Sequence, residues 1–309
     1  MKRHELWRLQ YRQKRYMEHI SQEELEKRIE DVFRNKLILT EEGKIGLRPI
    51  SRVGEYWAVM WTHLLEEMGL RGTGMPPGNL LSPEIFPKAT WPRAPSAAKM
   101  LKGRKFDAGY CLFKYGEKKY LKKLHDDGVI RVAPATFYND ASLNSAIKDD
   151  ERILSVFHHP ASVNITHVDR NTGKETKIKP TGNVKTTFEL STNYYVYCMS
   201  YVYDLRLFDD FQADACVVIH DTKGFLNRLD ASFKKLIGFW GFITDQVRYV
   251  DPLNPPEEKD IDLFFCKHFR YSYQKEVRSV WVPEKSVEQL KPVYLEIGPM
   301  GAYSEYIEL

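Results

Sequence analysis

The amino-acid sequence predicts an α+β fold with a helical N-terminal extension. After about residue 105, candidate strands outnumber candidate helices. These strands do not alternate regularly with helices, as they would in a doubly wound parallel sheet. The 309 residues are 43% hydrophobic and 13% aromatic, a composition that supports a substantial core. We expect a helical region over 1–71, a linker or wrapping arm over 72–104, and a core domain over 105–309.

The sequence pattern of residues 1–71 predicts amphipathic helices. Ser21 and Glu24 form a capping-box pattern, in which each side chain bonds the other residue's backbone N–H. Apolar residues then recur at helical spacing at Leu25, Ile29, Val32 and Phe33. A second stripe contains Val53, Trp57, Met60, Leu64 and Met68, and Gly69 is expected to end it. Both stripes are typical of packing surfaces.

The second part is dense in proline and glycine. Six prolines lie between Pro76 and Pro95, a density that neither a helix nor a central strand tolerates. We therefore expect a semi-rigid linker or wrapping arm. The glycines superficially resemble a phosphate-binding loop, but no Lys-Ser/Thr pair follows Gly78, so a P-loop is not expected.

The third part contains runs of apolar and β-branched residues bounded by turn signals. Helices are expected at 118–127, ended by Gly128, and at 225–236. Segments 163–168 and 175–179 flank a turn that contains Asn171 and Gly173, which predicts a hairpin. Further strands are expected at 110–114, 129–133, 194–199, 215–219, 246–250, 277–282 and 293–297.

Positive charge gathers in two segments. Residues 1–20 carry a net charge of +4, and residues 99–131 carry +6. The first segment mixes cations with Trp7, Tyr11 and Tyr16, a combination that suits a phosphate backbone with stacked bases. A solvated helix face with its aromatic residues packed inward is the alternative. The candidate nucleic-acid contacts are Arg8, Arg12, Lys14, Arg15, Lys118 and Lys122.

The cysteines and histidines do not suggest a metal site. The four cysteines form no close CxxC pair, and three of them lie in apolar, strand-like runs typical of buried free thiols. Neither His158-His159 nor Cys266-x-His268 has a second pair at ligand spacing, so no zinc is expected. No signal peptide or membrane-length apolar stretch is visible, and a reduced, cytoplasmic protein is the expectation.

The most informative stretch lies near the end of the chain. Gln274 and Glu276 immediately precede an apolar alternation and are two residues apart, so an extended backbone points both to one face. An amide and a carboxylate side by side can orient a ribose and a nucleophile. Pairing of Glu276 with Arg278 or Lys114 in a structural ion pair is the alternative.

Four segments stand out together: 112–115 (Leu-Phe-Lys-Tyr), 135–140 (Ala-Thr-Phe-Tyr-Asn-Asp), 198–200 (Cys-Met-Ser) and 273–278 (Tyr-Gln-Lys-Glu-Val-Arg). Their order and spacing over residues 108–285 resemble a large bacterial family. Its motifs are Tyr-Lys-Tyr, Phe-Asn-Asp, Cys-Phe-Ser and Tyr-x-x-Glu-x-Arg. This chain departs from that pattern at Met199, where the family has Phe, and at Ala141, where it commonly has Pro.

That family in turn resembles a divergent branch of the ADP-ribosyltransferase fold, a split β-sheet that cleaves NAD. The resemblance implies that Glu276 is the catalytic carboxylate, that Gln274 faces the acceptor and that Lys114 holds NAD from the first strand. Ser200 or Tyr138 would fill the second NAD-binding position, and Asn139 with Asp140 would fix a loop. Nicotinamide would stack on Phe113, Tyr115, Phe137 or Tyr138, and Lys114 or Arg278 would pair with the pyrophosphate.

Each of these residues also has a structural interpretation: a surface lysine at Lys114, core aromatics at Phe137 and Tyr138, and a buried strand serine at Ser200. The resemblance nevertheless favours an enzyme that transfers ADP-ribose from NAD to a macromolecule. Single-stranded RNA or DNA is slightly preferred over protein as acceptor. Such enzymes often act as bacterial toxins or phage-defence effectors, with an antitoxin or inhibitor as partner.

Two alternatives to this reading remain. The chain is either a non-catalytic nucleic-acid-binding or interaction protein on the same scaffold, or an NAD hydrolase with water as acceptor. The first would depend on Arg12, Lys14 and Arg15 rather than on Glu276. The second would consume NAD without labelling a macromolecule.

Overall fold

A computed structural model describes residues 1–309 except 75–91, 101, 105 and 107–109, and the side chains of Arg52 and Val53. The N-terminal region is helical, as predicted, with α1 (Arg3–Gln13), α2 (Gln22–Lys36) and α3 (Arg52–Arg71). The capping box of Ser21 and Glu24 forms as expected. A short antiparallel hairpin of β1 (Leu37–Leu39) and β2 (Ile45–Leu47) separates α2 from α3.

The end of α3 differs from the prediction. Gly69 lies inside the helix, and the helix ends at Arg71 with Gly72 as its cap. The φ of Gly72 is +69°, a left-handed conformation that glycine adopts without steric cost, whereas Gly69 needs no such conformation. An apolar stripe therefore marked the buried face of this helix correctly but not its last turn.

Most of the proline-rich segment lies outside the described residues. Within the range predicted as a linker, α4 (Ala94–Met100) is nevertheless a helix. The carboxylate of Asp209 accepts hydrogen bonds from the backbone N–H groups of Arg93 and Ala94 at 3.0–3.2 Å, and so caps the start of α4. Ala97 and Ala98 are buried against the core, so this part of the range is docked rather than free.

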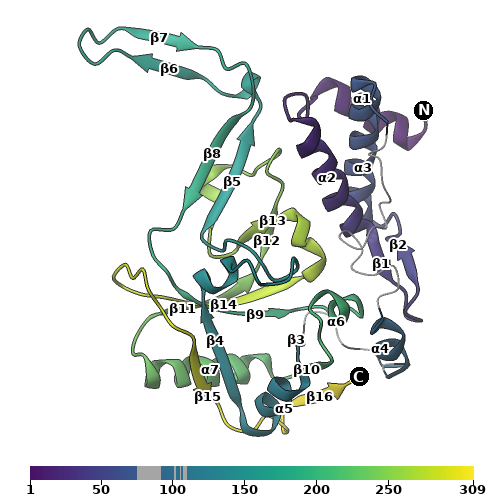
Figure 1. Ribbon diagram of the computed structural model, residues 1–309, viewed down its shortest axis with the longest axis vertical. Helices are drawn as coiled ribbons and strands as arrows, with labels where there is room; N and C mark the ends of the chain where they lie inside the picture. The colour runs from purple at the N-terminus through teal and green to yellow at the C-terminus, as the bar shows by residue number, and fades with distance from the viewer. Residues whose placement is uncertain (75–91, 101, 105, 107–109) are drawn as a thin grey trace.

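The core is a largely antiparallel sheet, which confirms the α+β expectation (Figure 1). Its strands follow the order β11-β14-β9-β3-β10-β16, with β4 pairing β9 at one end and β15 pairing β4. Neighbouring strands are mostly distant in sequence, so the sheet depends on long-range contacts. The bounds are β3 Leu112–Gly116, β4 Val129–Pro134, β9 Tyr195–Ser200, β10 Ala215–Ile219, β11 Gly241–Gln246, β14 Glu276–Val282, β15 Val293–Glu296 and β16 Ser304–Glu308.

Alternating side chains give this sheet two buried faces. Helices α5 (Lys118–Asp127) and α7 (Thr222–Leu236) cover one face, where Phe225, Leu229 and Phe233 pack on Trp281 and Val217. The other face carries α4 and the short helix α6 (Arg206–Asp210) over β3 and β10. Where β9 and β14 continue this second face, polar and charged side chains replace the apolar ones, as described below.

A long two-stranded arm extends from the core (Figure 1). Strands β5 (Ile153–His158) and β8 (Val184–Glu189) form its base. The predicted hairpin at 163–179 is confirmed as β6 (Ile165–Val168) and β7 (Glu175–Ile178), almost wholly exposed. A parallel pair, β12 (Arg248–Val250) and β13 (Cys266–His268), lies beside the base. Short 3₁₀ segments complete the structure: η1 Ala135–Asn139, η2 Pro160–Ser162, η3 Glu258–Asp260 and η4 Phe269–Gln274.

Helix α2 packs directly on η4, the segment that leads into Glu276. Arg28 forms a buried, two-pronged ion pair with Asp251, with N–O distances of 2.8 and 2.6 Å. The amide of Asn35 donates to the backbone carbonyls of Phe269 and Arg270 at 3.3 and 3.0 Å. The N-terminal helices thus fix the backbone that enters the candidate site.

The four cysteines are free thiols, and Cys111, Cys216 and Cys266 are buried, in line with the sequence expectation. In the part of the chain that the structure describes, no helix combines the length and apolar composition needed to cross a membrane.

Candidate functional site

Glu276 opens strand β14 and lies at the centre of a buried charge cluster. Its carboxylate accepts a hydrogen bond of 2.6 Å from Arg278 Nε and one of 3.0 Å from Lys267 Nζ. Its backbone N–H donates to the hydroxyl of Tyr249 at 2.8 Å. The alternative interpretation of the sequence, an ion pair between Glu276 and Arg278, is therefore confirmed. Only 5% of Glu276 is exposed, so both cations are needed to offset the burial of its charge.

Two further carboxylates complete the cluster. Glu151 forms an ion pair with Arg278 and lies 3.5 Å from Lys267 Nζ. Asp149 lies 3.9 Å from the same nitrogen. Lys267 comes from β13, whereas the two acids come from the segment before β5, so three separate parts of the chain supply the cluster. Three carboxylates thus surround two cations, and the cluster as a whole has an excess of negative groups.

The acidic segment, residues 146–151, is held in place by hydrogen bonds to its backbone. Gln274 Nε2 donates to the carbonyl of Ala146 at 2.6 Å, and the hydroxyl of Tyr271 donates to that of Lys148 at 2.6 Å. The hydroxyl of Tyr194 donates to the Glu151 carbonyl at 2.9 Å. Such fixed backbone positions preorganise the carboxylates, as a catalytic or binding site requires.

The η1 turn holds the acidic segment from its other side. The backbone N–H of Asp149 donates to the carbonyl of Tyr138 at 2.9 Å, and the amide of Asn139 donates to the Asp150 carboxylate at 3.0 Å. The Phe-Tyr-Asn-Asp motif at 137–140 therefore connects to the cluster through these two contacts. Its predicted function as a loop-fixing turn agrees with this geometry.

The cluster shifts the pKa values of Glu276 and Asp149 in opposite directions. Burial would raise the pKa of Glu276, but the charges of Arg278 and Lys267 outweigh it and hold that pKa well below its usual range. Burial and the neighbouring Glu151 raise the pKa of Asp149 to about 6. Glu276 is consequently ionised at neutral pH, while Asp149 titrates close to it, which suits a group that accepts or releases a proton.

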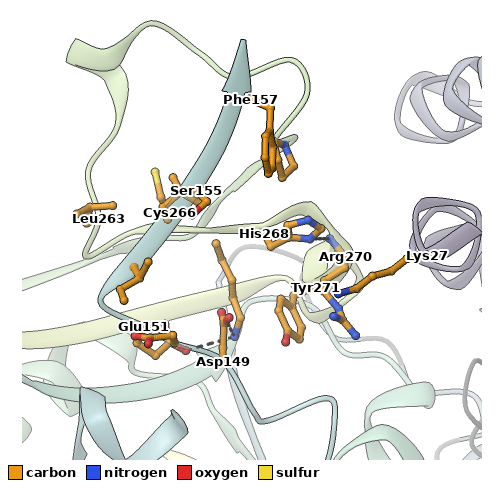
Figure 2. A pocket seen from close by; sticks show the side chains of 15 residues that line it. Lys27, Asp149, Glu151, Ser155, Phe157, Leu263, Cys266, His268, Arg270 and Tyr271 are labelled. Carbon is orange, nitrogen blue, oxygen red and sulfur yellow. Dashed lines mark hydrogen bonds and ion pairs between the residues drawn. The ribbon is translucent and has the colours of Figure 1, made fainter. Parts of the chain in front are cut away.

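A cavity of about 290 Å³ opens beside the cluster and is lined by Asp149, Glu151 and Lys267 on one side. Lys27 and Arg270 line it as well, and Figure 2 shows Lys27 reaching from α2 toward Arg270. The rings of Tyr271 and His268 supply aromatic surface; burial lowers the pKa of His268 to about 3, so its imidazole is neutral. Cations, carboxylates and aromatic rings around one cavity suit a ligand that carries both phosphate and ring groups.

The structure brings several of the predicted site residues to the face of the sheet that carries Glu276. The extended backbone expected over 274–276 is not formed, because Gln274 ends η4 and Lys275 has a left-handed φ of +49°. Gln274 is nevertheless buried, and its side-chain Oε1 lies 3.4 Å from Lys267 Nζ. Ser200 is paired with Glu276 across β9 and β14, and its hydroxyl lies 2.8 and 2.9 Å from the carbonyl oxygens of Val202 and Gln274, to one of which it donates its proton. Tyr138 packs against Cys198 on the same face. Since backbone groups occupy the Ser200 hydroxyl, its role is structural in this geometry.

Lys114 occupies the other face of the sheet. Its neighbour in β3, Leu112, belongs to the core under α5 and α7, and alternation places Lys114 on that same side. Its ammonium lies 4.4 Å from the centroid of the Tyr197 ring and donates to the Cys198 carbonyl at 2.7 Å. The expected partnership of Lys114 and Glu276 around NAD is therefore not formed. Ser200 pairs with both Phe113 and Glu276, so Phe113 shares the face of Glu276 and its neighbour Lys114 points to the opposite face.

The aromatic residues predicted to stack on nicotinamide lie elsewhere. Phe113 and Tyr115 are buried in the core beneath α6, and the Tyr115 hydroxyl accepts a bond from the backbone N–H of Asp204. Phe137 is half-buried and packs under the guanidinium of Arg131, 4.3 Å from the ring centroid. Among these rings only Tyr138 neighbours the charge cluster. Core packing explains Phe113 and Tyr115 without a ligand.

The basic residues predicted to contact nucleic acid are paired with carboxylates or amides. On α1, Arg8 and Arg12 lie 3.6 and 2.6 Å from Glu66, and Arg15, just after the helix, lies 2.8 Å from the buried Glu67. Lys14 lies 3.5 Å from the Asn254 side chain. On α5, Lys118 pairs with Glu308, and Lys122 pairs with Asp126. These contacts attach α1 to α3 and leave it less free charge than the sequence suggests.

Sequence reasoning missed Lys267, Asp149 and Glu151. The three consecutive acids at 149–151 were a usable signal, because so dense an acidic run beside apolar strands needs cations. Lys267 was a weaker signal, because it is a single lysine within a short stretch that the sequence would allow to form a strand. Neither signal identifies Glu276 as the partner, since the contacts join segments far apart in the chain. Comparison with protein-family models, curated proteins and solved structures found no match to this chain.

Proposed function

We propose that the chain is an NAD-dependent ADP-ribosyltransferase whose reaction centre is the Glu276 cluster. The observation that supports this most directly is the ionised Glu276 carboxylate, held in a buried, fixed position next to a cavity lined by three cations and three carboxylates. Cleavage of the bond between nicotinamide and ribose builds positive charge on the sugar. A preorganised anion stabilises such a charge far better than water does.

In the proposed reaction the acceptor nucleophile attacks C1 of the nicotinamide-bearing ribose. The N-glycosidic bond breaks, and its electron pair leaves with nicotinamide, which departs as a neutral ring. The proton of the acceptor passes to Asp149, whose pKa of about 6 makes it a carboxylate at neutral pH. Lys27 and Arg270 at the cavity wall would pair with the pyrophosphate.

Lys267 has a second role in this scheme. Its ammonium stands between Glu276 and the cavity, 3.0 Å from the Glu276 carboxylate and in the cavity wall itself. A pyrophosphate in the cavity would compete for this ammonium, which would free one oxygen of Glu276 for the ribose. The Lys267→Met variant should then bind NAD more weakly and also unfold more easily, because it leaves three carboxylates with one cation.

Radiolabelled NAD tests the proposal and identifies the acceptor. Purified protein and a cell extract are incubated with NAD labelled in the adenylate moiety, then separated into RNA, DNA and protein fractions. Label in one fraction, absent with Glu276→Gln, supports transfer and names the acceptor class. Loss of NAD without any labelled macromolecule would indicate hydrolysis instead, and intact NAD with no change in melting temperature would contradict the proposal.

The competing function, a non-catalytic nucleic-acid-binding or interaction protein, draws less support from the site. Of the cations that it depends on, Arg12 and Arg15 are engaged by Glu66 and Glu67, whereas the charge cluster has no role in it. The role as a toxin or defence effector and the antitoxin partner are implied only by the family resemblance. Survival of cells that express wild type or Glu276→Gln would test the toxin role.

A further inference from the structure

Two histidines and a glutamate meet at a second place, between the N-terminal helices and the base of the arm. Glu18 and His19 lie in the turn that follows α1, and His159 follows the last residue of β5. One possible ligand atom from each side chain lies within 4.8 Å of the other two. The two imidazole rings are 5.0 Å apart between centroids, and both face the Glu18 carboxylate.

The distances suit a bridging ion better than direct contact. His19 Nε2 and His159 Nε2 lie 4.0 and 3.9 Å from Glu18 Oε2, which is too long for a hydrogen bond. In a tetrahedral zinc site with bonds of about 2.0–2.2 Å, ligand atoms are separated by about 3.4 Å. Movement of about half an ångström would bring both histidine–glutamate distances to this value, and the third pair of ligand atoms starts within 4.8 Å. The three side chains are 28–44% exposed and have room to move.

We propose that Glu18, His19 and His159 bind a zinc-like divalent cation that joins the turn after α1 to the end of β5. Imidazole nitrogen with one carboxylate oxygen is a donor set that suits Zn²⁺, Ni²⁺ or Cu²⁺, whereas Mg²⁺ and Ca²⁺ prefer oxygen alone. Three protein ligands leave a coordination position for water. The ion would tie the N-terminal helices, which carry Lys27, to the arm and the acidic segment.

Two contacts of the ligand side chains compete with metal coordination and lower the affinity for the ion. His159 Nδ1 accepts a hydrogen bond of 3.2 Å from the backbone N–H of Ala161, so the neutral ring carries its proton on Nε2. Coordination of the neutral ring through Nε2 requires the other tautomer, with the proton on Nδ1, and therefore breaks the hydrogen bond from Ala161. Arg15 lies 3.4 Å from the other oxygen of Glu18 and competes for its charge. Zinc must therefore displace both contacts in order to bind.

Isothermal titration with ZnCl₂ tests the site on the full chain, with any affinity tag removed and the protein first stripped by EDTA. We expect one Zn²⁺ per chain and a melting temperature that rises with zinc and falls again with EDTA. His159→Ala and His19→Ala should each weaken binding by at least about 100-fold, because even outer-shell partners of ligands cost about 10–100-fold. His158→Ala, one residue away and outside the set, is the matched control.

Cobalt provides a second readout that does not depend on stability. Co²⁺ bound by nitrogen and oxygen gives visible ligand-field bands without a thiolate charge-transfer band, which separates this site from the free cysteines. Absence of bound zinc, a thiolate band, or binding unchanged in both His159→Ala and His19→Ala would overturn the proposal. Retention of these bands in His158→Ala and their loss in His159→Ala would support it. The result is independent of NAD turnover.

Discussion

Arg278 and Glu276 stand two residues apart on one face of β14, joined by a hydrogen bond of 2.6 Å from Nε to Oε1. Because period-two alternation brings them together, the strand itself supplies both a carboxylate and the cation that keeps it ionised. Arg278 is fully buried and also pairs with Glu151. A side chain that serves two carboxylates links β14 to the acidic segment.

Replacing Arg278 should therefore destabilise the protein severely. Arg278→Leu leaves Glu276 and Glu151 buried with Lys267 as their remaining close cation, and removing one partner of a buried pair costs about 3–5 kcal/mol. Urea unfolding followed by tryptophan fluorescence measures the change. Arg131→Leu, at an exposed position, should cost less than about 1 kcal/mol. Equal losses in the two variants would show that the cluster contributes nothing specific to stability.

Asp149 should impose a pH dependence that Asp149→Asn removes. Its pKa is raised to about 6 in the folded protein, so the native state holds a proton that the unfolded state has already released. Stability from this group is therefore present at about pH 4 and is lost as pH rises through about 6, with a total of roughly 1–3 kcal/mol. The variant should gain stability relative to wild type over that interval. A difference that stays constant with pH would place the Asp149 pKa near its ordinary value.

The N-terminal helices should be required for the folded site. Arg28→Met breaks the buried pair with Asp251 that anchors α2 beside η4, and should lower the free energy of unfolding by about 3–5 kcal/mol. Adding Asp251→Leu removes the uncompensated charge, so the double variant should recover part of the loss. A double-variant cycle by chemical denaturation measures this. If the two losses simply add, the pair is not coupled in the way that the distances indicate.

The basic residues of α1 should act mainly through α3. Arg15→Glu places a negative charge beside Glu67, which is fully buried, and should lower the melting temperature by several degrees. Lys122→Glu, at an exposed pair on α5, should change it little. A gel-shift assay with single-stranded RNA then separates an effect on stability from an effect on RNA binding. Loss of RNA binding by folded Arg15→Glu, without a change in melting temperature, would instead favour α1 as a nucleic-acid surface.

Local signals in the sequence predicted part of the elements, and did not predict strands β5, β8, β11, β13 and β16. The helix at 118–127 and the strand at 215–219 match α5 and β10 residue for residue, because capping glycine and apolar runs are local properties. The face on which Glu276 and Arg278 lie was also predictable from their spacing. The helix at 94–100 was not, since a cap from the distant Asp209 stabilises it.

The partners in the site were beyond sequence reasoning. Lys267 and Glu151 meet Glu276 only because β13 and the acidic segment converge on β14, which is a tertiary relationship. Lys114 shows the reverse error: its motif neighbours suggested proximity to Glu276, but its parity in β3 puts it on the other face. The sequence showed no second pair of metal ligands for His159. Its two candidate co-ligands, Glu18 and His19, come from the turn after α1.

The central claim is that Glu276 drives cleavage of the nicotinamide–ribose bond, and nicotinamide release from NAD measured by chromatography tests it most directly. Wild type, Glu276→Gln and the exposed control Glu288→Gln are compared after circular dichroism has shown each to be folded. We predict release by wild type and Glu288→Gln, and a loss of at least about 100-fold in Glu276→Gln, the scale of removing one electrostatic stabiliser. Equal release by all three, or none by wild type with cell extract as acceptor, would contradict the account.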